Sequence, residues 1–460
     1  MTATQMSRAM TFPATRRPGS RPNRLPAGVA FYLQASIVVS FLAASSAPTP
    51  LYAIYQVRWG FSPITTTIVF GVYAVAVLAA LLTVGSLSDH VGRRPVLITA
   101  IGLQAIAMLV FTTAGGVPEL LLARVIQGLA TGAAVGAVGA GMLDLNKAKG
   151  TIANAVAPLL GTATGGVLAG LLVQYLPAPQ HLVFLVLLGI TVVQGIGVVL
   201  MAETVTPKAG ALASLRPRLG VPTQAVGPVL VAVPVLLAVW ALGSFYASLG
   251  PALVRQIVGS SSVVLGGLAL FVLAGSGAVA VALLRNVAPR TVMLFGILAL
   301  VIGVGITLIA VAWLSTALLF GGMTVAGLGF GAGFQGAIRT VVPLAEPDQR
   351  AGLLATLYVV SYLALGLPAV VAGFLVVHGG GILPTVREYG IAVMVLAAIA
   401  LPGVLRPKRG RTAQGPTGHV SVIQEPNATS GQSTMKPEAP NAVPATVPSN
   451  PATVPLAARF

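Results

Sequence analysis

A short polar segment, GSLSDHVGRRPVL at residues 85–97, holds the side chains of this sequence that are best suited to ionic chemistry. Only 8% of the 460 residues are charged, yet this segment places an aspartate and two arginines between two long apolar stretches. Asp89, Arg93 and Arg94 can form ion pairs, and Gly85 and Gly92 permit the tight turn of such a loop. These residue types could hold the loop against a neighbouring part of the protein through ion pairs. The alternative is that the positive charges only keep the loop on one side of the membrane.

The sequence lacks the residue sets that covalent catalysis needs. It contains no cysteine, which excludes disulfides, thiol catalysis and thiolate metal sites. It also contains no Walker sequence, metal-ligand cluster or nucleophile–base set. Gly331, Gly333 and Gly336 match a dinucleotide-binding pattern, but they lie inside an apolar stretch rather than after a strand. We therefore predict no catalytic residue, no metal, no cofactor and a protein that is not an enzyme.

Arg124 is the second chemically distinctive residue, because it lies well inside an apolar segment. An arginine at membrane depth costs about 2.5–3.5 kcal/mol on insertion scales and usually faces a cavity or a partner. None of the nine acids lies at mid-depth, and Glu119 is roughly 7.5 Å away along a helix. Two interpretations stay open: Arg124 faces a solute cavity, or it is a structural arginine bonded to carbonyls or to Gln34.

Composition identifies the elements that must position these residues. The chain is 56% hydrophobic with a mean hydropathy of +0.93, and its apolar runs are long enough to cross a bilayer as helices. We predict twelve membrane helices, a linker at 203–226 and polar tails at 1–27 and 406–460, the second of them disordered. The predicted helices cover 28–52, 63–84, 95–115, 118–142, 150–175, 181–202, 227–249, 262–284, 291–313, 315–338, 350–377 and 388–405.

The positive residues that give the net charge of +17 are distributed unevenly along the chain. Most lysines and arginines fall in the tails and in alternate loops, whereas the intervening loops hold Arg58, Arg255 and Arg387. This asymmetry predicts a multi-pass protein of the cytoplasmic membrane with both termini in the cytoplasm, beginning with a retained signal-anchor. A nucleic-acid partner is excluded, since its basic patch would not alternate loop by loop, and the lipid bilayer is the predicted partner.

The two halves of the chain carry traces of one repeated unit. HVGRRPVL at 90–97 aligns with NVAPRTVM at 286–293, and QGLATG at 127–132 aligns with AGLGFG at 326–331. Asp144 has its counterpart in Glu346 at a similar spacing. Repeated helical bundles around a central site are typical of secondary transporters.

Two motifs resemble those of the major facilitator superfamily. The loop matches G-x-L-x-D-x-x-G-R-R, and RVIQGLATG matches R-x-x-Q-G through Arg124, Gln127 and Gly128, with Gly132 beyond it. The resemblance covers residues 28–405 and is closest to drug- or solute:proton antiporter-like members. It implies an all-α membrane protein with twelve transmembrane helices in two pseudo-symmetric six-helix bundles, at 28–202 and 227–405.

The resemblance also implies roles for individual residues. In the family, the loop aspartate contacts the start of helix 11 and pairs with a loop arginine and an acid of helix 4. We predict that the eleventh helix of this chain begins at Glu346-Pro347-Asp348. The implied latch residues are Gly85, Asp89, Gly92, Arg93, Arg94 and Asp144, and those of the substrate cavity are Gln34, Arg124, Gln127, Trp240, Tyr246 and Gln335.

Helix 5 resembles the antiporter motif only in part. APLLGTATGG at 157–166 supplies Gly161, Gly165 and Gly166, but Thr162 stands where the motif has proline. We expect these glycines, like Gly128 and Gly132, to permit close helix packing.

The predicted function is secondary transport of a small-molecule organic solute by a monomer, as proton-linked efflux. Glu119 and Arg124 are the candidate proton-coupling pair. A substrate-borne proton, a facilitator or uptake permease, and a non-transporting receptor or scaffold are the alternatives.

Overall fold

The computed structural model describes residues 24–346 and 348–406, and every element within them is helical. The predicted basic tail up to residue 23, the carboxyl-terminal tail from 407 and Pro347 lie outside the described residues. Twelve helices are long and apolar enough to cross a membrane. The first six are α1 (Ala27–Ser46), α3 (Pro63–Val84), α5 (Arg93–Thr113), α6 (Val117–Leu145), α7 (Lys147–Tyr175) and α8 (Pro179–Leu200). The second six are α10 (Val226–Ser248), α12 (Val263–Leu283), α13 (Pro289–Trp313), α14 (Thr316–Val341), α15 (Arg350–His378) and α16 (Ile382–Ile399).

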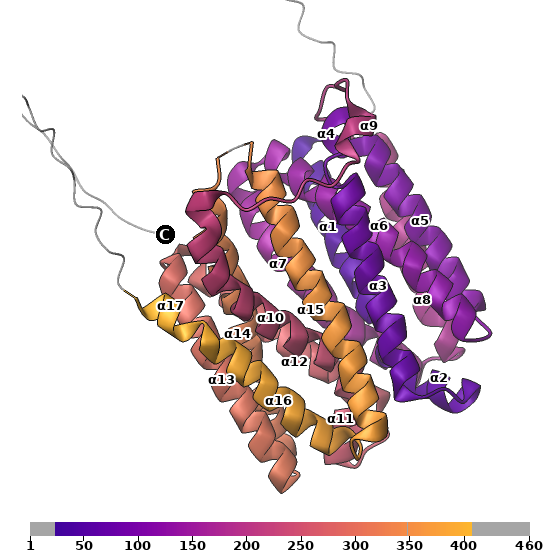
Figure 1. Cartoon of the computed structure of the whole chain (residues 1–460). Helices are drawn as coiled ribbons and strands as arrows, with labels where there is room; N and C mark the ends of the chain where they lie inside the picture. Colours follow the sequence, from indigo (N-terminus) through magenta and orange to yellow (C-terminus); the bar gives the residue numbers. More distant parts are fainter. Residues whose placement is uncertain (1–23, 347, 407–460) are drawn as a thin grey trace, which may run out of the picture. The chain divides into compact units, whose positions relative to one another are not determined.

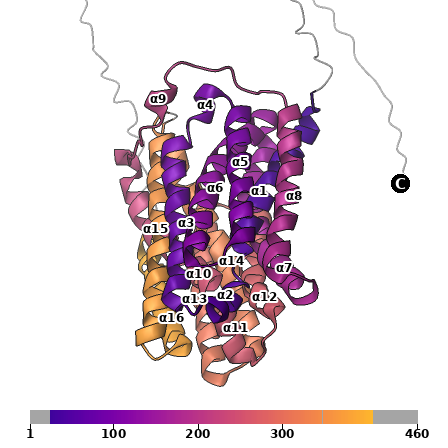
Figure 2. The ribbon, with the colours of Figure 1, turned by 90° about the vertical axis from the view of Figure 1, so that its right-hand side faces the viewer.

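Short helices mark the two ends of the helical bundle (Figures 1 and 2). At one end, here called the linker end, lie α4 (Ser88–Val91), α9 (Ala211–Ser214) and the linker between the halves. At the other, the short-helix end, lie α2 (Tyr52–Trp59) and α11 (Gly250–Val258), which the sequence analysis did not predict. Both end at a glycine with positive φ, Gly60 at 66° and Gly259 at 67°. These glycines have the same spacing as QGLATG and AGLGFG, and they extend the repeat to α2 and α11.

Glycines bring the helices of the first half into close contact. A Cβ added at Gly128 of α6 would lie 2.5 Å from the Cβ of Ala76 on α3, and one at Gly132 would lie 2.6 Å from the carbonyl oxygen of Val77. Gly165 of α7 lies against the backbone of Ala43 on α1. These contacts place α6 and α7 around α1 and α3, which fixes the position of Arg124 on α6.

The two halves meet through α3 with α15 and through α7 with α12. A Cβ at Gly166 of α7 would be 3.4 Å from the carbonyl oxygen of Gly267 on α12. On the other pair of helices, a Cβ at Gly366 of α15 would be 3.7 Å from the carbonyl oxygen of Gly71. Among the described residues, every such glycine contact between membrane helices of different halves falls at 67–74, 163–170, 263–275 or 366–373. These segments lie in the middle of the helices or toward the short-helix end.

The side-chain hydrogen bonds between the two halves also lie toward the short-helix end. The Oε1 of Gln174, near the end of α7, accepts from the Ser262 hydroxyl at 2.7 Å and from the Val264 backbone N–H at 3.2 Å. Within 24–346 and 348–406, no other side-chain hydrogen bond joins a membrane helix of the first half to the second. The halves are therefore fastened at the short-helix end.

Candidate gating and transport site

A charged cluster at the linker end is built around Arg93, the first residue of α5. Its Nη1 donates to a carboxylate oxygen of Asp89 and, at 2.7 Å, to the Ser88 hydroxyl. Its Nε donates to Asp144 Oδ2 at 3.2 Å. The Arg93 side chain is 8% exposed, whereas that of Asp89 is 54% exposed. The structure thus brings Asp89, Arg93 and Asp144 together from three helices of the first half.

Glu203 is a fourth member of this cluster, and it was not among the predicted site residues. Its carboxylate accepts the backbone N–H groups of Arg93 at 2.8 Å and Arg94 at 3.0 Å. A carboxylate is favoured there by the unpaired N–H groups and dipole of a helix amino terminus. Gly92 has a φ of +105°, and a Cβ at this position would lie 2.6 Å from Glu203 Oε2. The loop glycine therefore serves both the turn and the approach of Glu203.

Arg94 bonds to backbone carbonyls, whereas Arg93 bonds to carboxylates. Its guanidinium donates to the carbonyl oxygens of Val198 and Val199 at the end of α8. Arg290, its counterpart in the repeat, donates to the carbonyl oxygens of Val404 and Arg406 at the end of the second half, each at 2.5 Å. Both arginines satisfy terminal helix carbonyls.

The ion-paired cluster is confined to the first half. The counterpart of Arg93 is Pro289, which has no side-chain donor. Among the described residues the Asp89 carboxylate bonds only to Arg93, and no hydrogen bond or ion pair joins it to α15. The linker covers this region, since the Lys208 N–H donates to the His90 carbonyl at 2.8 Å and the Ser86 hydroxyl to the Ser214 carbonyl at 3.0 Å.

Arg124 is fully buried and is surrounded by neutral groups. Its guanidinium donates to the Ser45 carbonyl and to Gln127 Oε1, each at 2.8 Å, and to the Tyr52 hydroxyl. Three aromatic rings, including that of Tyr73, have centroids 5.3–5.8 Å from its Cζ, within the range of cation–π attraction. Gln127 Nε2 in turn donates to the Ala44 carbonyl at 3.0 Å. The pair fastens α6 to the end of α1.

The structure does not bring together Glu119 and Arg124. Glu119 is exposed in the first turn of α6, and no acid lies among the hydrogen-bond or ion-pair partners of Arg124 in the described chain. Five positions along α6 separate the two side chains. Carbonyl, amide and phenol oxygens accept from the two Nη atoms of Arg124, whereas its buried Nε has no partner in the described chain. Gln34 is not among those partners either, since its Nε2 donates to the Met201 sulfur at 3.3 Å.

The remaining predicted cavity residues lie in separate places. Tyr246 is buried inside the second half, with its hydroxyl 3.3 Å from that of Thr307. Gln335 Nε2 donates to the Val281 carbonyl at 3.1 Å. Trp240 lies in an aromatic group with Phe334 and Tyr362, at centroid distances of 5.6 and 5.3 Å.

Tyr362 is a residue that the predicted site omitted, although α15 was expected. Tyr362 and Trp240 pack against an apolar cluster that includes Phe70 and Ala74 of the first half and Leu365 and Ala369 of the second. An aromatic group therefore lies where α3 of one half meets α10 and α15 of the other.

These features define a polytopic membrane protein of the transporter type. They are the two pseudo-symmetric helical halves, the ion-paired loop at the linker end, and the glycine contacts of α6 and α7. The chain belongs to the Major Facilitator Superfamily, whose family model matches residues 35–302. The fold and the family expected from the motifs are thus confirmed.

The comparisons with individual proteins are more distant. The putative multidrug resistance protein MdtD of Escherichia coli (strain K12) is 34% identical over 158 residues, which is 32% of this chain and 32% of MdtD. The match therefore spans about a third of the length of that curated relative. The nucleoside transporter NupG has a TM-score of 0.61 at 15% identity, covering 83% of this chain and 100% of NupG. The human organic anion transporter MFSD10 (TETRAN) has a TM-score of 0.59 at 17% identity, covering 83% and 99%. These two structures establish a shared fold alone.

Proposed function

We propose that this chain is a secondary transporter of the cytoplasmic membrane that exports a small organic solute by alternating access. The observation that carries the proposal is the uneven fastening of the two halves. Gln174 and the glycine contacts join them toward the short-helix end, while the cluster around Arg93 bonds only within the first half and to the linker region. Such an arrangement belongs to one of two alternating states.

The linker end is the cytoplasmic end in this proposal. Arg93, Arg94, Arg290 and Arg339 lie at that end, and lysines and arginines accumulate in cytoplasmic loops. In the opposite state of the cycle, the linker ends approach and the exposed carboxylate of Asp89 meets the first turn of α15. Arg93 and Asp144 hold α4 in position for that contact.

Export is favoured over uptake by the similarity to a protein described as a putative multidrug resistance protein. The Glu119–Arg124 pair is not part of the proposal, because the partners of Arg124 are neutral. Coupling then rests on a proton that the substrate carries, and a facilitator of the same fold is the second candidate.

The test is transport by the purified chain in proteoliposomes. Labelled nucleosides and organic anions, which are the substrates named for the two structural neighbours, and lipophilic cationic dyes as general drug probes are presented with and without a pH gradient. The proposal expects saturable flux of one class that Asp89→Asn reduces at least tenfold, with Glu388→Gln, which changes an exposed acid of α16 outside the latch, as the control. Accumulation against a gradient favours the active transporter, and equilibration alone favours the facilitator. Absence of flux for every class would favour a receptor or scaffold.

A further inference from the structure

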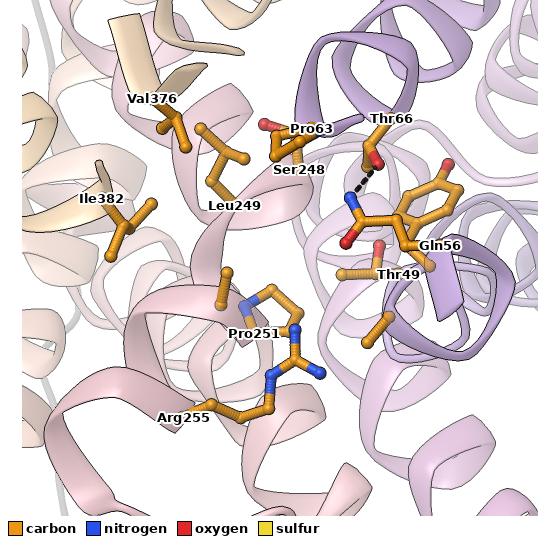
Figure 3. Close-up of a pocket in the computed structure, with 13 residues that line it drawn as sticks. Thr49, Gln56, Pro63, Thr66, Ser248, Leu249, Pro251, Arg255, Val376 and Ile382 are labelled. Carbon is orange, nitrogen blue, oxygen red and sulfur yellow. Dashed lines mark hydrogen bonds between the residues drawn. The ribbon is translucent and has the colours of Figure 1, made fainter. Parts of the chain in front are cut away.

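A small cavity of about 60 Å³ lies at the short-helix end, between the two halves (Figure 3). The first half contributes Thr49, Tyr52 and Gln56 from the region of α2 and Thr66 from α3. The second half contributes Ser248 and Arg255 from α10 and α11. Apolar side chains fill the rest of the wall, and none of the lining residues is acidic.

Arg255 is a cation without a counter-charge in this cavity. Burial lowers the pKa of Arg255, because the charged form loses contact with water. Within residues 24–346 and 348–406, its guanidinium has no hydrogen-bond or ion-pair partner. Figure 3 draws that guanidinium turned inward, toward the space between Pro251 and Thr49. A partly buried charge of this kind is stabilised when an anion supplies the missing partner.

The repeat offers a direct comparison with Arg58 of α2. The guanidinium of Arg58 bonds to Gln180 Oε1 at the start of α8, and this contact is exposed. The two short helices thus carry one arginine each, but only that of α11 faces a cavity between the halves. The difference separates Arg255 from a basic residue that merely marks the end of a membrane helix.

A second positive group lies behind the cavity wall. Tyr52 lines the cavity, and its hydroxyl accepts a hydrogen bond from Arg124. Arg124 has no acid among its partners, so its charge adds to the positive potential at the cavity. The Thr49 hydroxyl and the Arg255 N–H groups supply donors, whereas Gln56 Nε2 is already committed to the Thr66 hydroxyl at 2.7 Å.

The volume limits the occupant. One water molecule takes about 30 Å³ in the liquid, whereas pockets for drug-sized ligands measure about 300–1,000 Å³. At about 60 Å³, the cavity is large enough for a halide ion or a carboxylate group and smaller than the pockets that enclose drug-sized ligands.

We propose that this cavity is a binding site for a small monovalent anion, held by Arg255, and that the anion stabilises the state in which the short-helix ends are joined. The anion is either an inorganic ion from solution or the carboxylate of an organic molecule, and both have the same charge and similar size. Because the walls come from both halves, the occupied site bridges them. The proposal does not depend on the direction or the substrate of transport.

Thermal unfolding of the full chain in nanodiscs of zwitterionic lipid tests the site, since no lipid headgroup there carries a net negative charge. Chloride, formate and gluconate are titrated at constant ionic strength. Chloride or formate should raise Tm saturably by a few degrees, and the bulky gluconate should not. Saturation by chloride assigns an inorganic occupant, and saturation by formate alone assigns a carboxylate. Arg255→Gln should abolish the saturable response, whereas Arg58→Gln should retain it.

Two further variants keep the test decisive. Gln56→Glu places a carboxylate in the cavity, and it should raise Tm without added anion and remove the response. Because the chain has no cysteine, Gln174→Cys with Ser262→Cys reports the joined state by disulfide formation, which the active anion should accelerate only while Arg255 is present. No saturable response in the parent chain, or the same response in Arg255→Gln, would overturn the proposal.

Discussion

Glu203 caps the helix that begins at Arg93, although the two residues are 110 positions apart in the chain. The hydrogen bond from the Arg93 N–H to Glu203 Oε1 is 2.8 Å long and connects the residues just after α8 to the start of α5. The loop motif is thus completed by a residue far outside it, and this has consequences for stability.

Loss of the cap should destabilise the first half. Replacing a helix-capping side chain by alanine costs about 0.5–2 kcal/mol, so Glu203→Ala should lower Tm measurably. Gly92→Ala should cost at least as much, because it combines a φ of +105° with the 2.6 Å contact to Glu203. Gly102→Ala in α5, where a Cβ meets nothing within 4 Å, is the matched control and should leave Tm unchanged or slightly higher. Equal Tm values for all three variants would contradict the capping role.

Substitutions of the two loop arginines, Arg93 and Arg94, should differ in their effects on Tm and on flux. Arg93→Ala removes two ion pairs whose carboxylates are partly exposed, which contribute about 0–1 kcal/mol, and it leaves the buried Ser88 hydroxyl without its donor. We expect a modest fall in Tm, with flux reduced at least tenfold because α4 is released. Arg94→Ala and Arg290→Ala leave terminal carbonyls unpaired, and each should lower Tm. Thermal unfolding and proteoliposome flux, measured on the same preparations, distinguish these outcomes, and normal flux in Arg93→Ala would leave the loop a topological role only.

The contact between Gly166 and Gly267 should control the balance of the two states. Gly267→Ala introduces a methyl group against the Gly166 backbone and should weaken the join between α7 and α12. Slower disulfide formation between cysteines at 174 and 262 is the expected result. Gly275→Ala, whose Cβ would be 4.0 Å from that of Ala163, is the control at the same interface. If both variants crosslink at the parental rate, the glycine contact does not set the balance.

Arg124 should act through packing rather than through Glu119. Arg124→Gln leaves the Ser45 carbonyl and the Tyr52 hydroxyl without their donor, and unsatisfied buried groups cost about 1–3 kcal/mol each. A lower Tm is therefore expected. Glu119→Gln should retain flux driven by a pH gradient to within about twofold. Abolition of driven flux with preserved exchange at equal pH would instead restore Glu119 as a coupling residue.

The twelve helices and the family could be predicted because their signals are local: apolar runs of sufficient length and two short motifs. Which face of each helix meets which neighbour could not. The membrane helices are apolar on nearly all sides, so periodicity carries little information about orientation. The assignment of Gln34 and Tyr246 to a substrate cavity therefore stays a prediction, and in the structure each side chain bonds within its own half.

The cap by Glu203 and the short helices were missed for a different reason. A cap formed across 110 positions has no sequence periodicity, since it depends on the packing of α5 against α8. The helices α2 and α11 did leave a signal, because Gly60 and Gly259 repeat the spacing of the other duplicated segments.

The Gly166–Gly267 contact divides α7 into a long segment toward the linker end and a short segment toward the short-helix end. At 1.5 Å per residue, the helix extends about 28 Å from this contact to its start at Lys147, but only about 14 Å to its other end. A rocking motion of about 10° around the contact would move the linker end of α7 by about 5 Å, roughly twice the travel of the short-helix end. A pivot placed off centre thus gives the larger aperture to the side that carries the charged cluster.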